Sequence, residues 1–370
     1  MKIGIDLLWV RPNICGGTES FIRNLMDGFG RFTPEDEYVL FTARDNADSF
    51  RGYEQYPNMT LKVCPVDCSR QSRRILWENL HLHRYAKREN VDVMFIPVYS
   101  KPVSLGSKIP YICVIHDLQA LHYPQYFSRA RRAFLRFMWW HACKTARLVI
   151  TGSDFCKEDI IAHYPWVSHK IQTIYHPIIT ENTACDLAPL AKRLGITEGE
   201  YYYCVSAMLP HKNLITVLKV MAELKKSGER IKLVLSGVGG QNQEFIETVR
   251  QLQIEDMVVQ TGFVSNEERD CLYENCKVFL FPSIFEGFGM PPIEAMRKGK
   301  NVVMTQETCL KEVTEGKAVY VTEPFNVQEW VEKIQVAETR EARVEKFEKY
   351  NLVNVVSQYR TSFLNVLKSK

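Results

Sequence analysis

The chain has 370 residues and a formal net charge of +4, with 46% hydrophobic and 24% charged residues, as in ordinary folded globular proteins. This length exceeds what one compact core holds, so the sequence predicts two domains. The start of the chain lacks the features of a signal peptide, and no stretch approaches the ~20 apolar residues of a membrane span. We therefore expect a cytoplasmic protein.

Short apolar runs, typical of buried parallel strands, alternate with helical patterns along the chain. The strand-like runs are Ile3–Val10, Tyr38–Thr42, Val91–Pro97, Tyr111–His116, Leu148–Thr151, Ile171–Tyr175, Tyr201–Ser206, Lys232–Ser236, Val258–Gly262, Val278–Phe281, Asn301–Met304 and Ala318–Val321. The helical patterns are 18–31, 71–89, 129–146, 155–163, 212–227, 241–253, 266–275 and 291–298. This alternation predicts an α/β fold with doubly wound sheets.

A stretch near 178–198 reads as irregular and precedes a second strand-and-helix series. It divides the chain into predicted domains at 1–180 and 195–345, followed by a helical segment at 346–370. We expect that last helix to pack back on the N-terminal domain. Ligands of doubly wound sheets bind beyond the carboxyl ends of the strands, and two such sheets facing each other would form a cleft.

The 11 cysteines are odd in number and irregularly spaced, with no Cys-x-x-Cys pair. Neither Cys64 with Cys68 nor Cys271 with Cys276 has histidines at zinc-ligand spacing. We therefore expect reduced, mostly buried thiols and no metal site. The sequence also lacks an Asp-x-Asp at a strand end, the pattern that holds a divalent ion in metal-dependent sugar transfer.

The most informative segment runs from Phe281 to Met296, with the sequence Phe-Pro-Ser-Ile-Phe-Glu-Gly-Phe-Gly-Met-Pro-Pro-Ile-Glu-Ala-Met. It joins a strand to a helix through two glycines, which leave backbone amides open to a ligand, and through prolines suited to a helix start. A helix N-terminus attracts phosphate. Glu286 precedes the turn and Glu294 lies in or near the first helical turn, so each would reach a different part of a ligand.

This segment resembles the Glu-x7-Glu motif of the retaining GT-B glycosyltransferases of family 4, related to glycogen and sucrose synthases. The resemblance implies two Rossmann-like domains facing a cleft. It implies that Glu286 contacts the sugar of a nucleotide-diphosphate donor and acts in catalysis, and that Glu294 binds the donor ribose. The backbone of the loop between them would hold the diphosphate, through Gly287, Phe288, Gly289 and Met290.

Three positions in the first half agree with this family pattern. Gly16 and Gly17 open a helix after the first strand; this is a turn suited to phosphate, although a plain turn is equally common. His116 ends a strand, where a cleft residue belongs. The resemblance implies that the glycines face the donor phosphates and that His116 faces the donor sugar as a catalytic residue. Ser153 resembles a donor-binding serine and could equally cap the following helix.

In the second half, Lys212 opens a helix after a strand and offers a compact positive charge for a diphosphate. Many family members carry an arginine six residues earlier, where this chain has Ser206. His211 is a candidate to supply part of the missing interaction. Phe263 and Val264 match the segment whose backbone reads the nucleobase. The resemblance implies no cofactor and no metal.

The basic residues are concentrated between 62 and 147, where 15 basic and 5 acidic side chains give an excess of ten. Within 129–147, a helical projection places Arg129, Arg132, Arg136, Lys144 and Arg147 on one face with Trp140, and Phe134, Phe137 and Leu148 opposite. The alternatives are a solvated charged stripe or a surface that rests on anionic lipid, with Trp139 and Trp140 at the interface.

The expected partners are therefore a nucleotide sugar, a glycan or lipid-linked acceptor, and an anionic membrane surface. Nucleic acid is not expected, because no recognised binding module accompanies the basic residues. Two other functions fit the fold: an epimerase or phosphorylase of the GT-B type, and a non-catalytic nucleotide-sugar-binding protein. The Lys-Asn at 212–213 resembles bacterial mannosyl- and rhamnosyltransferases of surface polysaccharides, which makes GDP-mannose the first donor to test.

Overall fold

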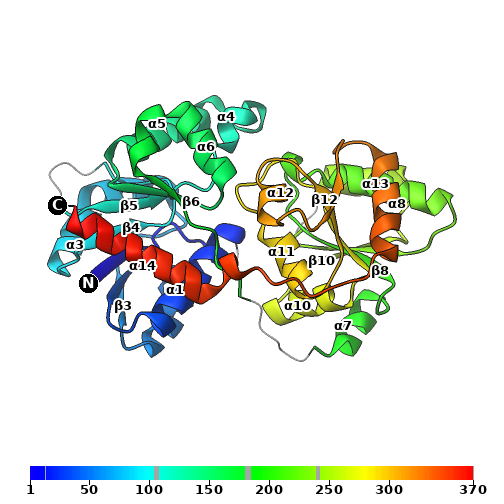
Figure 1. Cartoon of the computed structure of the whole chain (residues 1–370), viewed down its shortest axis with the longest axis horizontal. Coiled ribbons are helices and arrows are strands. Elements are labelled where there is room, and N and C mark those ends of the chain that lie inside the picture. Colours follow the sequence, from blue (N-terminus) through cyan, green and yellow to red (C-terminus); the bar gives the residue numbers. More distant parts are fainter. Residues whose placement is uncertain (13, 104–107, 180–184, 239–241, 370) are drawn as a thin grey trace. The chain divides into compact units, whose positions relative to one another are not determined.

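The computed structural model describes residues 1–12, 14–103, 108–179, 185–238 and 242–369. The chain forms two compact units (Figure 1). The N-terminal unit comprises Met1–Ile179 together with Glu348–Lys370, and the C-terminal unit comprises Thr180–Phe347. Each unit is built around its own parallel sheet.

The sheet of the N-terminal unit has seven parallel strands in the order β3-β2-β1-β4-β5-β6-β7. Their bounds are β1 (Lys2–Asp6), β2 (Glu37–Thr42), β3 (Met59–Val63), β4 (Val93–Ile96), β5 (Tyr111–Val114), β6 (Leu148–Thr151) and β7 (Ile171–Thr173). The order reverses between β1 and β4, where connections leave in opposite directions and a binding crevice opens. Successive residues of β2 belong to two different hydrophobic cores. Tyr38 and Leu40 lie in one core and Val39 and Phe41 in the other, so both faces of the sheet are covered.

The helices of this unit include one from the far end of the chain. They are α1 (Gly17–Phe32), α2 (Gln71–Trp77), α3 (His83–Arg88), α4 (Gln119–His122), α5 (Arg129–Thr145), α6 (Asp154–His163) and α14 (Leu352–Lys368), with short helical turns at Ala47–Gln55, Glu78–Leu82, Pro124–Tyr126, Pro165–Lys170 and Glu348–Tyr350. In Figure 1, α14 (red) lies beside α1. Val355, Tyr359 and Phe363 of α14 are fully buried in the same core as Ile3 and Ile5 of β1.

The sheet of the C-terminal unit has six parallel strands in the order β10-β9-β8-β11-β12-β13. Its strands are β8 (Tyr201–Val205), β9 (Lys232–Ser236), β10 (Val258–Gly262), β11 (Val278–Phe281), β12 (Val302–Thr305) and β13 (Val319–Val321). Its helices are α7 (Leu187–Leu194), α8 (Leu214–Lys226), α9 (Gln243–Gln251), α10 (Asn266–Asn275), α11 (Met290–Arg297), α12 (Leu310–Val313) and α13 (Val327–Thr339), with a short turn at Pro210–Lys212. The order reverses between β8 and β11, which makes that point the expected ligand crevice.

Three elements differ from the sequence-based expectation. Met59–Val63 forms an edge strand that was not expected, and its mixed exposure explains the weak apolar pattern. Leu187–Leu194 is helical within a stretch expected to be irregular; Asp186 caps its start and Gly195 ends it in the left-handed conformation. The helix expected at 71–89 is interrupted by a π-helical turn at Glu78–Leu82.

The expectation of reduced cysteines throughout is wrong for one pair. Cys185 and Cys271 form a disulfide, with their Cα atoms 5.3 Å apart. Cys271 belongs to α10, which packs against α7, and Cys185 directly precedes α7, so the packing of these helices brings the two residues together. The other nine cysteines are free, and eight of them are buried.

Candidate functional site

Two loops meet at the switch point of the C-terminal sheet, one after β8 and one after β11. The carbonyl oxygen of His211 accepts hydrogen bonds from the backbone N–H of Ile284, at 2.8 Å, and from Oγ of Ser283, at 3.2 Å. The loop containing Lys212 is therefore fixed against the loop containing Glu286.

Lys212 and Glu286 form an ion pair between these loops. Lys212 Nζ lies 2.6 Å from Glu286 Oε1, and the two side chains are 20% and 12% exposed. The ammonium group is thus partly exposed and already has an anionic partner. An incoming phosphate group would compete with Glu286 for this charge.

The loop from Glu286 to Met290 is held by the segment after β12. The backbone N–H of Glu286 donates to Thr308 Oγ1 at 3.2 Å, and Cys309 Sγ donates to the carbonyl oxygens of Glu286 and Phe288 at 3.2 and 3.3 Å. Gly289 has a φ of 85°, and a Cβ atom there would lie 2.7 Å from Leu310 Cδ2. Only glycine fits this position, directly before the N-terminus of α11.

Glu294 lies just past the first turn of α11 and is held by α10. Tyr273 donates its hydroxyl to Glu294 Oε2 at 3.0 Å, and Arg269 Nε lies 3.9 Å from the same oxygen. The negative charge of Glu294 raises the pKa of Arg269. Arg269 and Tyr273 were not expected as site residues, because no pattern in α10 indicates which residues face a neighbouring helix.

The remaining predicted residues of this unit lie at the carboxyl ends of β8 and β10. Ser206 follows β8, and its backbone N–H donates to the carbonyl oxygen of Ser236 at 2.9 Å. Phe263 and Val264 follow β10, and Phe263 is 74% exposed.

His211 cannot replace the arginine as a cation, because burial, with the Lys212 charge, lowers its pKa to about 4. Its contribution is the carbonyl oxygen that joins the two loops.

In the N-terminal unit, Gly16 and Gly17 stand at the start of α1. Gly16 has a φ of 55°, and a Cβ atom at either glycine would meet nothing within 4 Å. The backbone conformation at position 16 therefore favours glycine, and both glycines leave open space at a helix N-terminus.

His116 follows β5 and is a neutral imidazole. Its Nε2 donates to the carbonyl oxygen of Pro97 at 2.9 Å, and burial lowers its pKa to about 4. Ser153 is completely buried, and its hydroxyl accepts the backbone N–H of Cys156 at 3.3 Å as the N-cap of α6. The structure thus supports the capping role for Ser153.

A cavity of about 360 Å³ lies at the switch point of the N-terminal sheet. The loops after β1, β4 and β5 line it together with α2 and α5; its polar and aromatic lining includes Trp9, Arg11, Arg74, Tyr99, His116, Asp117 and Arg131. Of these, only His116 was expected as a site residue from the sequence. The others could be found only from the strand order, which shows which loops meet.

The helix α5 exposes different aromatic residues from those expected. Trp139 is 2% exposed and belongs to the core, while Phe137 and Trp140 are 48% and 43% exposed, with their ring centroids 6.0 Å apart. The expectation that Phe137 lies opposite Trp140 is therefore wrong. Residues three apart lie on the same side of an α-helix, so the spacing of Phe137 and Trp140 itself makes them neighbours.

Within the described residues, no group of three or more His, Cys, Asp or Glu side chains is arranged to hold a metal ion. Among the helices of the same residues, none has the length and apolar character needed to cross a membrane.

Family models match both halves of the chain. The model described as Glycosyltransferase Family 4 matches residues 15–182, and the model described as Glycosyl transferases group 1 matches residues 190–352. Together they span both parallel sheets apart from β1. The chain belongs to the family 4 and group 1 glycosyltransferases.

Two curated relatives of this glycosyltransferase are named as bacterial O-antigen chain mannosyltransferases. It is 27% identical over 221 residues to O-antigen chain mannosyltransferase B of Escherichia coli, a match covering 58% of each chain. It is 28% identical over 236 residues to O-antigen chain mannosyltransferase RfbU of Salmonella typhimurium, covering 64% of this chain and 63% of the relative. The matched region therefore spans about three fifths of these relatives.

The fold of the glycosyltransferase also matches solved structures. Anabaena HepE in complex with UDP and glucose is similar with a TM-score of 0.68 and 18% identity, over 100% of this chain and 98% of that one. This confirms the expected architecture of two Rossmann-like domains.

Proposed function

We propose that this glycosyltransferase moves a hexose from a nucleotide-diphosphate sugar to a glycan or lipid-linked acceptor, with retention of the anomeric configuration and without a metal or cofactor. The observation that carries the proposal is the Lys212–Glu286 pair at the switch point, beside the N-terminus of α11. A leaving nucleoside diphosphate is stabilised by a fixed cation beside a helix N-terminus.

In the proposed reaction, negative charge grows on the phosphate oxygen as the sugar departs. Lys212 and the amides of Gly287–Met290 stabilise this charge, and Glu286 orients the sugar as it becomes oxocarbenium-like. Glu294, held by Tyr273, binds the ribose. The bond from the anomeric carbon to the phosphate oxygen breaks, the acceptor oxygen bonds to that carbon on the same face, and the departing phosphate takes the proton of the acceptor hydroxyl.

The family pattern assigns donor contacts to further residues of both units as part of the same proposal. Gly16 and Gly17 offer amides to the diphosphate. His116, neutral at physiological pH, hydrogen-bonds a hydroxyl of the donor sugar rather than carrying charge. Phe263 and Val264 contact the nucleobase, and Ser206 lies near the diphosphate.

Mannose is the sugar we propose first, and GDP-mannose the donor, because the relatives named above are mannosyltransferases. A thermal-shift panel of GDP-mannose, UDP-glucose and UDP-N-acetylglucosamine tests this, since a ligand that binds the folded state raises its melting temperature. The largest shift is expected with GDP-mannose, and a larger shift with a UDP-sugar would contradict the choice of donor. Proton NMR of the first-formed product tests retention.

Exposed residues on α5 support a membrane contact as part of the same proposal. Phe137 and Trp140 are exposed beside Arg136 and Lys144, a combination that suits anionic lipid. We expect the protein to sediment with vesicles containing phosphatidylglycerol and not with pure phosphatidylcholine. Trp140→Ala should reduce binding, whereas Phe325→Ala, an exposed aromatic of the C-terminal unit, should not. No sedimentation at low salt would exclude the membrane contact.

A further inference from the structure

The cavity at the switch point of the N-terminal sheet carries an unusual concentration of positive charge. Arg11, Arg74 and Arg131 all line it, from the loop after β1, from α2 and from α5. Asp117 is the one carboxylate among the described lining residues. Three like charges on one cavity repel each other, and an anion between them would relieve that repulsion.

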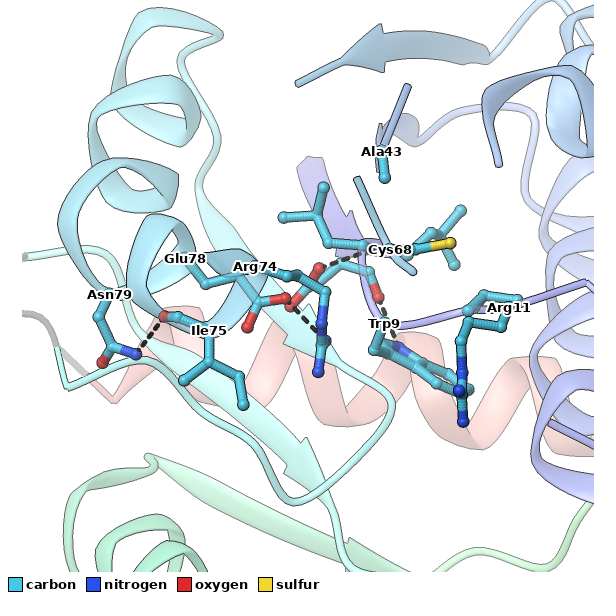
Figure 2. Close-up of polar contacts among 12 residues, drawn as sticks. Trp9, Arg11, Ala43, Cys68, Arg74, Ile75, Glu78 and Asn79 are labelled. Carbon is cyan, nitrogen blue, oxygen red and sulfur yellow. Dashed lines mark hydrogen bonds and ion pairs between the residues drawn. The ribbon is translucent and has the colours of Figure 1, made fainter. Parts of the chain in front are cut away.

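Arg74 is held in place from behind the cavity. Its Nη1 donates to Glu78 Oε1 at 2.9 Å, and the two side chains are only 8% and 2% exposed. Figure 2 shows Arg74 extending past Ile75 on the same side as Trp9 and Arg11. Glu78 begins the π-helical turn that interrupts this helix, an irregularity that is frequent at functional sites.

Asp6 completes this buried cluster at the end of β1. The side chain is 0% exposed, Oδ1 accepts the backbone N–H of Leu8 at 3.0 Å, and Oδ2 has no hydrogen-bond partner among the described residues. Burial raises the pKa of both Asp6 and Glu78, and the charge of Arg74 opposes this rise. A carboxylate pair that retains a proton leaves the positive charge of the cavity incompletely balanced.

Arg131 is oriented from the opposite wall. Its Nη2 donates to the hydroxyl of Tyr99 at 3.1 Å, and its guanidinium carbon lies 5.6 Å from the ring centroid of Phe134. These contacts fix the plane of the guanidinium and leave other N–H groups for a ligand. A planar guanidinium recognises phosphate or carboxylate through two parallel hydrogen bonds.

We propose that this cavity binds an oxyanion of the sugar acceptor, with Arg11, Arg74 and Arg131 as its cations and Glu78 as the residue that positions Arg74. This inference rests on the proposed function, because it assigns the acceptor to the N-terminal unit. The cavity volume of about 360 Å³ suits one sugar residue with its attached phosphate or carboxylate. Trp9, Tyr99 and Phe134 supply apolar surface for the sugar ring.

The test is a calorimetric titration of the full chain with three probes: inorganic pyrophosphate, glucuronate and glucose. The thermal-shift panel identifies the preferred nucleotide sugar. The nucleoside diphosphate of that donor is kept at saturation, so that the donor site is occupied. We expect saturable binding of at least one anion and none of glucose. Pyrophosphate binding would indicate a phosphate-bearing acceptor, and glucuronate binding a carboxylate-bearing one.

Variants locate the binding. Arg11→Gln and Arg131→Gln should each lower the affinity for the anion by roughly tenfold or more, which is the usual effect of losing a charged hydrogen bond. Arg84→Gln, on α3, exposed and outside the cavity, should have no effect. Glu78→Gln should lower the affinity for the anion. Glu78→Asp, which keeps the carboxylate, should lower it less.

The proposal is overturned if glucose binds as tightly as the anions, if neither anion binds, or if Arg84→Gln weakens binding as much as Arg131→Gln does. If no nucleoside diphosphate binds, the donor proposal fails separately. The titration is then run without nucleotide, in the Lys212→Ala background, and the arginine variants still decide the question.

Discussion

Separating the Lys212–Glu286 pair should have opposite effects on donor binding, depending on which partner is removed. Lys212→Ala removes the cation that we assign to the diphosphate and leaves the Glu286 carboxylate uncompensated beside it. Glu286→Gln removes the anion that competes for Lys212 and nearly preserves the side-chain shape. A structural ion pair with no ligand role would give no such difference in sign.

The expected magnitudes follow from the geometry. The 2.6 Å contact is between side chains only 20% and 12% exposed, so a phosphate replacing Glu286 would make a poorly screened, charge-assisted hydrogen bond. Such a bond contributes about 1.5–3 kcal/mol, which corresponds to a roughly 10- to 150-fold change in affinity. We expect Lys212→Ala to weaken nucleoside-diphosphate binding within this range. Glu286→Gln should tighten nucleoside-diphosphate binding, while turnover falls roughly 100-fold or more.

The assay pairs calorimetry of nucleoside-diphosphate binding with a rate measurement of sugar transfer or donor hydrolysis. Lys219→Ala is the matched control, because Lys219 lies on α8 and is exposed. Unfolding curves for each variant exclude a general loss of structure. Equal weakening of binding by both substitutions, or near-normal turnover of Glu286→Gln, would refute the reasoning.

Three further outcomes are expected. Gly289→Ala should destabilise the protein by about 1–3 kcal/mol in urea unfolding, because alanine would have to adopt a φ of 85° against Leu310; an unchanged midpoint would contradict this. Burial lowers the pKa of His211 in the folded protein to about 4, below its unfolded value, so its stabilising effect is present above pH 6.5 and is lost as the pH falls toward 4. His211→Asn should therefore reduce the pH dependence of the free energy of unfolding in urea between pH 6.5 and 4. Phe363→Ala should cost about 3–5 kcal/mol, measured by the same unfolding assay, because its fully buried ring fills the core under α1; a cost below 1 kcal/mol would show that α14 is not part of that core.

The central strands of both sheets could be predicted because they are buried on both faces and read as continuous apolar runs. Val278–Phe281 and Lys232–Ser236 have the predicted bounds. The edge strand Met59–Val63 could not, because its side chains are partly exposed and its pattern is weak. The π-helical turn at Glu78 has no sequence signature, since the apolar spacing continues through it.

The candidate donor site was predictable where chemistry is concentrated in a short motif. The Glu286–Glu294 segment carries glycines, prolines and carboxylates at fixed spacing, and Lys212 opens a helix after a strand. The cluster of Asp6, Arg74 and Glu78 was not predictable. Its members are far apart in sequence, and only the burial of two carboxylates against one guanidinium marks them as a group.

The return of α14 to the N-terminal unit also affects how the chain can fold during synthesis. The ribosome releases β1 to β7 first, but Tyr359 and Phe363, whose side chains complete their core, are made only after the whole C-terminal unit. The C-terminal unit is contiguous in sequence and can fold before the earlier unit is complete. We therefore expect nascent chains truncated before residue 352 to expose apolar surface on α1.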